Sequence, residues 1–239
     1  MRNRTLEDQE VKYLVLDMLK RESARDKQRM VGASNIGNPC DYCLAHAVAG
    51  TGGGKSNPFW LGARIGTAIH AALEEQAELH IDTPLEHKFN ALRGAKIEQK
   101  IVLGTIPGYG TIKSKPDLVL VEHNHLLDYK GSTKAKMQKM RATNTVPIQY
   151  EYQQQLYAWG LNREGIQVDR ISLVFIARDG SGDGDVWVHS FDYDEDKAVK
   201  AWERLEGIVA YIHEFGVEGI DNLDSHPDCW YCSNIIGRT

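Results

Sequence analysis

Residues 112–130 have the sequence IKSKPDLVLVEHNHLLDYK, and this stretch decides the predicted fold. The apolar run at 118–121 is typical of a strand buried on both faces. A second apolar stretch begins at Leu126 after a short polar segment, so the two together predict a β-hairpin. Asp117 starts the first strand and Asp128 lies late in the second. Because the strands of a hairpin run antiparallel, we expect the two carboxylates to lie close together.

Two adjacent carboxylates repel each other, and both stay ionised only when a cation lies between them. Oxygen ligands of this kind suit Mg²⁺ or Mn²⁺. Lys130 lies two residues after Asp128 and therefore shares its face of the strand. A lysine in that place can orient a water or stabilise a pentavalent phosphate, so the residues favour metal-assisted phosphodiester hydrolysis. The alternative is a solvated hairpin with two surface acids and a lysine, because each short motif is common by itself.

Four short motifs occur together in the chain. The pair 116–117 (Pro-Asp) followed by 128–130 (Asp-Tyr-Lys) resembles the signature of the PD-(D/E)XK nucleases. Residues 66–70 (GTAIH) and 153–157 (QQQLY) resemble motifs of the RecB-like, CRISPR-adaptation-type exonuclease branch of that superfamily. The resemblance covers about residues 33–232. It implies a restriction-endonuclease-like α/β core, in which helices flank a central mixed β-sheet.

The resemblance also implies a site. The implied metal ligands are the side chains of His70, Asp117 and Asp128 and the backbone carbonyl of Tyr129. Lys130 would be catalytic together with the two aspartates. Gln153 and Tyr157 would support the site and the DNA strand.

Helical periodicity places some of these residues on common faces. The spacing predicts a helix over 60–80, in which Leu61, Ile65, Ile69 and Leu73 form the buried stripe. His70 and Glu74 lie four residues apart on a neighbouring stripe. Glu74 either orients His70 or is exposed, and a lone helical histidine is more often a structural hydrogen-bonding group.

Other positions on predicted elements are candidate parts of the site. A helix is predicted over 147–162, which points Gln153 and Tyr157 the same way. Arg64 either contacts phosphate or is a surface charge. Glu98, in a strand predicted over 96–103, is either an additional acid at the metal or an exposed side chain.

The length of 239 residues suits one large domain, or a core with a small appendage. We expect an N-terminal helical segment at 1–30, packed on the core or on a partner, and a nuclease domain at 31–239. No stretch approaches the roughly 20 apolar residues of a membrane span, and the N-terminus lacks the pattern of a signal peptide. The expected location is therefore cytoplasmic, without a membrane.

The net charge of −5 does not by itself indicate a nucleic-acid-binding protein. The cations are nevertheless unevenly spread, and 130–141 contains basic residues but no acid. The candidates for a path along the DNA backbone are Lys134, Lys136, Lys139 and Arg141. The alternative is an ordinary solvated helix face.

Residues 49–56, AGTGGGKS, fit a loosened phosphate-loop pattern. Such a loop follows a buried strand and opens a helix. Here the preceding residues predict a helix, and Pro58 biases the residue before it away from helical geometry. A glycine loop is therefore favoured, with a nucleotide hydrolase as the weaker alternative.

All four cysteines occur as Cys-x-x-Cys pairs, Cys40 with Cys43 and Cys229 with Cys232. Disulfides are unexpected in a reducing cytoplasm, whereas four thiolates suit Zn²⁺ or an iron–sulfur cluster. Either would form a metal clip joining the N- and C-terminal segments; two separate redox pairs are the alternative.

Several RecB-like nucleases hold a [4Fe-4S] cluster with one cysteine before the core and three after it, whereas this chain has two and two. The pairs lack the following glycine that is common in zinc knuckles. We expect a [4Fe-4S] cluster, with structural zinc as the alternative.

The predicted function is divalent-metal-dependent hydrolysis of DNA, exonucleolytic, in a phage or mobile-element setting of recombination or repair. A non-catalytic nucleic-acid-binding module with a structural metal is the alternative. DNA is the expected partner, and a homo-oligomer or a recombination partner remains open.

Overall fold

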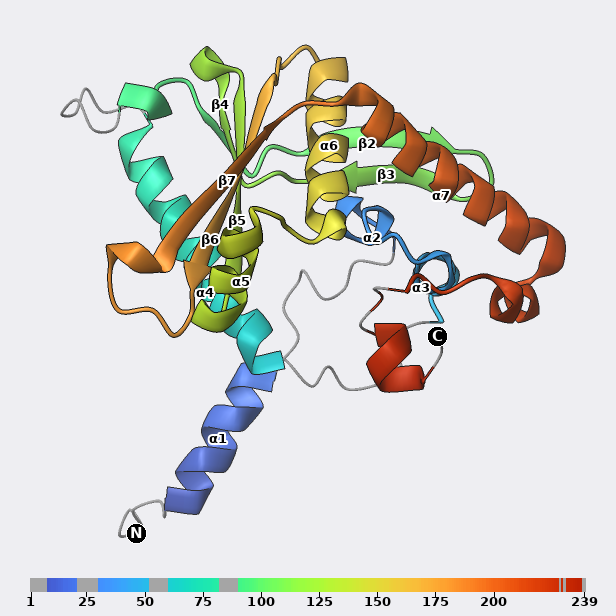
Figure 1. The fold of residues 1–239 in the computed structure, drawn as a ribbon, viewed down its shortest axis with the longest axis horizontal. Helices are drawn as coiled ribbons and strands as arrows, with labels where there is room; N and C mark the ends of the chain where they lie inside the picture. The colour runs from blue at the N-terminus through green and yellow to red at the C-terminus, as the bar shows by residue number, and fades with distance from the viewer. Residues whose placement is uncertain are drawn as a thin grey trace, which may run out of the picture.

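The computed structural model describes residues 8–20, 30–51, 60–81, 90–227, 229 and 231–237. A central sheet of five strands has the order β1-β4-β5-β6-β7. The strands are β1 (Lys96–Ile97), β4 (Leu118–Leu120), β5 (His125–Ser132), β6 (Arg170–Ala177) and β7 (Val186–Asp192). β5 and β6 are parallel and the other neighbours are antiparallel, so the sheet is mixed, as predicted (Figure 1).

The hairpin predicted from residues 112–130 is confirmed as β4 and β5. Val119 pairs with Leu126 in its register, and both side chains are fully buried. A turn of 3₁₀ helix (Val121–His123) joins the strands, and Asn124 follows it at a φ of 50°. Asparagine tolerates this left-handed backbone better than most residues, so the chain can reverse in a short space.

Helices flank both faces of the sheet, which confirms the predicted fold class. The long helices are α4 (Trp60–His80), α5 (Lys134–Thr143), α6 (Ile148–Arg163) and α7 (Glu195–Phe215). The main core contains Leu126 and Ile171 of the sheet, Leu156 of α6 and Leu205 of α7. These side chains are fully buried, and their burial from water is the main force that holds the helices on this face. None of the described helices has the length and apolar character needed to cross a membrane.

α4 covers the other face and approaches β5 closely. A Cβ atom on Gly131 of β5 would lie 3.5 Å from the Gly66 Cα of α4. Leu61 and Ile65 are 48% and 39% exposed, so their predicted burial in this helix was wrong. The helix approaches β5 through Gly66, and the side chains of Leu61 and Ile65 lie on a face that does not contact the sheet. His70, one turn after Gly66, lies where it can reach the sheet.

A second sheet pairs β2 (Ile101–Ile106) with β3 (Gly110–Ser114). It packs on α6, where a Cβ on Gly160 would lie 3.0 Å from the Ile101 and Leu103 side chains. The single strand predicted over 96–103 is therefore divided between two sheets. The division falls at Glu98, whose φ of 43° turns the chain out of the central sheet.

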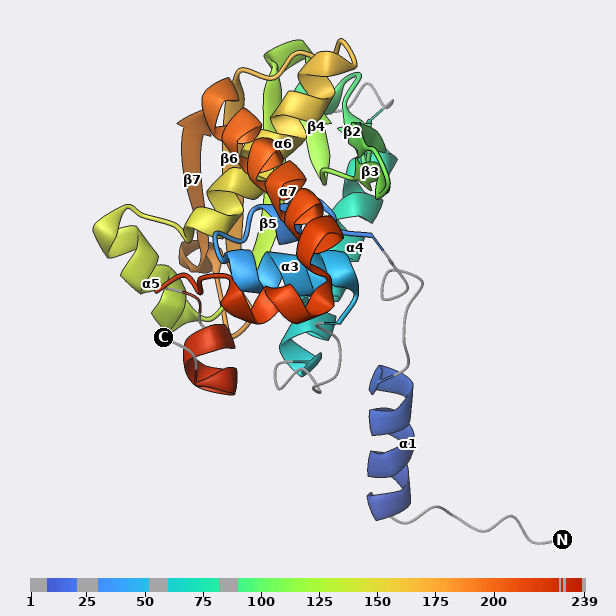
Figure 2. The same ribbon diagram turned by 90° about the vertical axis from the view of Figure 1, so that its right-hand side faces the viewer.

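The N-terminal residues form α1 (Asp8–Lys20), which projects from the main body and contacts it at α4 (Figures 1 and 2). Val11, Leu14 and Val15 of α1 are 44%, 51% and 41% exposed. The structure therefore does not show these three residues packed on the core. The other predicted role of the helix, contact with a partner, stays a prediction. Two short helices, α2 (Ala33–Ile36) and α3 (Asp41–Ala49), lie close to α6 and α7 (Figure 2).

Candidate active site and cysteine cluster

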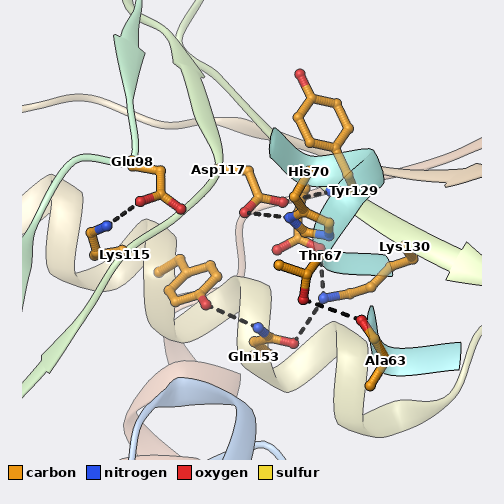
Figure 3. A network of polar contacts seen from close by, with 11 residues as sticks. Ala63, Thr67, His70, Glu98, Lys115, Asp117, Tyr129, Lys130 and Gln153 are labelled. Atoms are coloured by element: carbon orange, nitrogen blue, oxygen red, sulfur yellow. Dashed lines mark hydrogen bonds and ion pairs between the residues drawn. The ribbon is translucent and has the colours of Figure 1, made fainter. Parts of the chain in front are cut away.

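The residues predicted from the motifs lie around one cavity of about 810 Å³. Its lining includes His70, Asp117, Asp128, Lys130, Gln153 and Tyr157. They come from α4, from the residue before β4, from β5 and from α6. Figure 3 shows His70, Asp117, Lys130 and Gln153 pointing toward one another. The convergence expected from the antiparallel hairpin is thus present.

Asp117 links α4 to the sheet. Its Oδ1 lies 3.2 Å from His70 Nδ1, and its Oδ2 accepts a 2.8 Å hydrogen bond from the Tyr129 backbone N–H. The hydrogen bond to Asp117 raises the pKa of His70 above its ordinary value, against the opposing effect of burial. The carboxylate is therefore held in one orientation, and its contact stabilises the protonated form of the imidazole.

Asp128 and Lys130 share one face of β5. The Asp128 carboxylate is buried, with the residue 2% exposed, and its Oδ2 lies 2.6 Å from Lys130 Nζ. Burial raises the pKa of Asp128, although the charge of Lys130 opposes this shift. Lys130 Nζ also donates to Gln153 Oε1 at 3.1 Å. The ammonium therefore has two fixed acceptors and a defined position.

Gln153 is fixed in turn by Tyr157, which lies one turn later on α6. Gln153 Nε2 donates to the Tyr157 hydroxyl at 2.9 Å. This bond orients the amide so that its oxygen faces Lys130. Both residues are buried, at 6% and 8% exposure. The prediction that they point the same way is confirmed.

Glu98 and Glu74 also lie beside the site. Both line a smaller cavity together with His70 and Asp117. Glu98 forms an ion pair with Lys115 (Figure 3), and its backbone N–H donates to the Asp117 carbonyl at 3.0 Å. The φ of Glu98 is positive, at 43°, which is uncommon for a residue other than glycine. Such backbone conformations concentrate at functional sites.

The basic residues predicted on α5 lie elsewhere. Lys134 forms a 2.9 Å ion pair with Asp185, and Lys136 lies 6.0 Å from the centre of the Tyr150 ring. Lys139 and Arg141 are exposed. Within the described part of the chain, these four residues and Arg64 are not among those lining the two cavities beside the site.

The larger cavity has basic residues that the sequence analysis did not assign to the site. They are Lys100, Lys113 and Lys115, at the edges of β2 and β3. Residues 30–34, before and within α2, form another part of the wall. In the sequence, the alternation of Lys113 with apolar Ile112 is typical of a strand with one exposed face. It carried no signal that the strand borders the cavity.

The donor set fits a hard divalent cation, since it combines two carboxylates with an imidazole. Asp128 Oδ2 is buried and forms the ion pair with Lys130. In this arrangement Lys130 compensates the charge of Asp128, and His70 contacts Asp117. Among the described residues, the four cysteines are the one set of possible ligands whose atoms all lie within 4.8 Å of one another. The ligand atoms of His70, Asp117 and Asp128 are less tightly grouped.

The four cysteines form this second group, as predicted. The sulfur pairs Cys40–Cys232, Cys43–Cys229 and Cys43–Cys232 are each 3.5 Å apart. Burial raises the pKa of the Cys232 thiol to about 12 and also raises that of Cys43. A bound cation would overcome this preference for the protonated form.

The predicted phosphate loop falls mostly on residues 52–59, which lie outside the described residues. The segment before it is α3, a helix that ends at Ala49 with Gly50 in a left-handed cap. A phosphate loop follows a strand, so this setting argues against the nucleotide-hydrolase alternative.

Neither protein-family models nor curated proteins match the sequence. The fold is similar to that of an alkaline exonuclease from Laribacter hongkongensis, with a TM-score of 0.53, 15% identity and coverage of 81% of this chain and 91% of that chain. The complex of that enzyme with dAMP gives a TM-score of 0.50 at 14% identity, with coverage of 81% and 91%. A phage-related exonuclease from Haemophilus somnus 129PT gives 0.47 at 16% identity, covering 79% and 96%. The first two show that this chain has the fold of an exonuclease, and at such identities they show the fold alone; the third is too distant to add to it.

Proposed function

We propose that this protein is a divalent-metal-dependent deoxyribonuclease that removes nucleotides from DNA ends. The observation that carries the proposal is the gathering of Asp117, Asp128 and Lys130 in one cavity, beside His70. The exonuclease fold of the similar structures supports it, as does the binding of dAMP, a deoxynucleotide, by the Laribacter enzyme. The order of the motifs supports assignment to the RecB-like branch.

Asp117, Asp128, His70 and the Tyr129 carbonyl would hold Mg²⁺ or Mn²⁺, which supplies Lewis-acid stabilisation of phosphate charge and a more acidic water. The residues of the chain then have separate roles. His70 keeps the Asp117 carboxylate in place through their 3.2 Å contact. Lys130, oriented by Gln153, donates to the scissile phosphate or positions the attacking water.

The DNA backbone would enter along the wall formed by Lys100, Lys113 and Lys115. Phosphate neutralisation by lysine provides much of the affinity for DNA and no sequence preference. The basic residues of α5 remain a second candidate path, since they follow β5 directly. The net charge of −5 is compatible with either path because the relevant cations are local.

The test is cleavage of end-labelled single- and double-stranded DNA with Mn²⁺ or Mg²⁺, repeated with chelator. We expect release of mononucleotides only with the metal, and a loss of about 10²–10⁴-fold in rate for Lys130→Ala. Lys200→Ala, on the exposed face of α7 and outside both candidate DNA paths, is the matched control for charge removal. DNA binding without any metal-dependent cleavage would replace this proposal with the non-catalytic binding module.

A further inference from the structure

The arrangement of the four cysteine sulfurs distinguishes between one metal ion and a cluster. All four sulfurs lie within 4.8 Å of one another, and the pairs named above are 3.5 Å apart. Four thiolates bound tetrahedrally at the usual Zn–S length of 2.3 Å are about 3.8 Å apart. The sulfurs are therefore already spaced as the ligands of one ion.

A [4Fe-4S] cluster imposes a different spacing. Each of its four cysteine ligands binds a different iron and extends outward from a corner of the cube. The cysteine sulfurs consequently lie farther apart than the ligands of a single ion. The compact group formed by Cys40, Cys43, Cys229 and Cys232 does not fit this requirement. A disulfide does not fit either, since bonded sulfurs are about 2.05 Å apart.

We infer that the four cysteines bind a single Zn²⁺ ion, in place of the iron–sulfur cluster expected from the sequence. Among single ions, Zn²⁺ binds a given thiolate site more tightly than Fe²⁺. Zinc also has no preference against tetrahedral geometry. The site is closed, because Cys40 and Cys232 are fully buried and Ile236 packs against the group. Four protein ligands in a closed pocket are typical of a structural zinc site.

The zinc would join segments that are distant in the sequence. Cys40 and Cys232 are 192 positions apart, so the ion closes nearly the whole chain into a loop. Near the zinc, the Tyr42 backbone N–H donates to the Asp224 carbonyl at 3.2 Å. The Arg204 guanidinium of α7 donates to the Ile36 and Asn38 carbonyls. The ion therefore reinforces contacts that tie α3 to residue 224 and the end of α2 to α7.

The same segment continues into the wall of the candidate active site. Residues 30–34 line that cavity, and Cys40 lies a few residues later at the N-terminus of α3. The zinc would thus fix one end of the segment that forms this wall. Its role is structural, since the cysteines are not among the described residues that line the cavity.

Metal analysis of the full chain tests the inference without any activity assay. We expect a colourless protein with about one zinc per chain and no acid-labile sulfide. Cys229→Ser and Cys232→Ser should each reduce zinc below about 0.2 per chain and lower Tm by about 5–10 °C. Replacement of zinc by Co²⁺ should give the visible absorption of a tetrahedral thiolate site.

Two controls separate this site from the nuclease proposal. Ser233→Ala alters the exposed neighbour of Cys232 and should keep the zinc. Asp117→Asn removes a proposed ligand of the other metal and should also keep it. A brown protein with iron and sulfide would overturn the inference, as would a zinc-free chain with disulfides between these cysteines or one containing iron alone.

Discussion

At Asp128, burial and charge oppose each other. The carboxylate is almost inaccessible, and Lys130 Nζ at 2.6 Å is its compensating charge. Lys130 is held in turn by Gln153, whose oxygen is oriented by the bond from its amide to Tyr157. The position of the proposed catalytic lysine therefore depends on a residue that need not contact the DNA.

Gln153→Leu tests this dependence. We expect kcat to fall about 10- to 100-fold with KM for DNA nearly unchanged, because a lysine with a less defined position stabilises the transition state less well. Steady-state cleavage kinetics give both parameters. Gln138→Leu, on the exposed face of α5, should change neither. An equal rise in KM at constant kcat would assign Gln153 to substrate binding.

His70 makes metal binding depend on pH. Its pKa is raised by the hydrogen bond to Asp117, so the imidazolium contact stabilises the fold below pH 6.5 and is lost as pH rises through the higher folded-state pKa. A metal ligand must be neutral, so Mn²⁺ affinity should rise in that same window, by up to about tenfold per pH unit.

Titration of the protein with Mn²⁺ across this pH range measures the effect. His70→Asn should bind Mn²⁺ more weakly and lose the pH dependence that arises from the imidazole. With chelator present, the Tm of the wild type should fall as pH rises from 6.5 through the folded-state pKa of His70. The Tm of His70→Asn should fall less over the same range. A pH dependence identical in both proteins would exclude His70 as the group responsible.

Several of these residues could be predicted from short motifs, because Asp117, Asp128, Lys130, Gln153 and Tyr157 occur at the spacing of a known pattern. Glu98 was predicted to be either an additional acid at the metal or an exposed side chain. Its left-handed backbone and its ion pair with Lys115 depend on where the chain leaves one sheet for another. No local pattern reports such a transition.

At the scale of elements, the β2–β3 hairpin brings positive charge to the cavity. A double variant, Lys100→Ala with Lys113→Ala, should weaken DNA binding at every sequence alike. It should lower the slope of log K against log salt by about 2 if each lysine neutralises one phosphate. Binding of short duplexes by the Asp117→Asn protein, at several salt concentrations, measures both quantities.

The comparison variant is Lys139→Ala with Arg141→Ala on α5, which removes the same charge. We expect little change in its salt slope. The reverse result would move the DNA path from the hairpin to α5, as the basic run at 130–141 suggested. The hairpin path was missed because exposed lysines on a strand are common, and only the packing of that strand on α6 brings them to the cavity.

Close packing of α2 on α6 gives a prediction for stability. A Cβ at Gly37 would lie 2.6 Å from the Gln149 carbonyl oxygen and 2.9 Å from the Gln153 nitrogen, both backbone atoms. Gly37→Ala should therefore destabilise the fold by about 1–3 kcal/mol. Gly207→Ala, in the exposed middle of α7 with open space around it, should stabilise by about 0.5–1 kcal/mol. Urea unfolding at neutral pH compares the two, and similar effects would contradict this packing.

At the scale of the whole molecule, the mixed sheet, its helical layers and the meeting of the cysteine pairs all followed from the sequence. The sheet and its layers followed from the family resemblance, and the meeting of the cysteines followed from their paired spacing. Periodicity predicted single elements, such as the hairpin at 112–130. The sequence did not predict that β2 and β3 form a sheet of their own, or that residues 30–34 complete the cavity wall. Both depend on contacts between distant segments, which leave no local periodicity.

The central claim is that Asp117 and Asp128 share a divalent ion in the cavity beside His70. Anomalous diffraction from crystals of the full chain soaked in Mn²⁺ tests it directly. We predict a manganese peak between the two carboxylates, separate from the cysteine group, that disappears in Asp128→Asn. The claim would be contradicted if manganese were fully occupied elsewhere in the molecule and absent from this cavity, under conditions in which the protein degrades DNA.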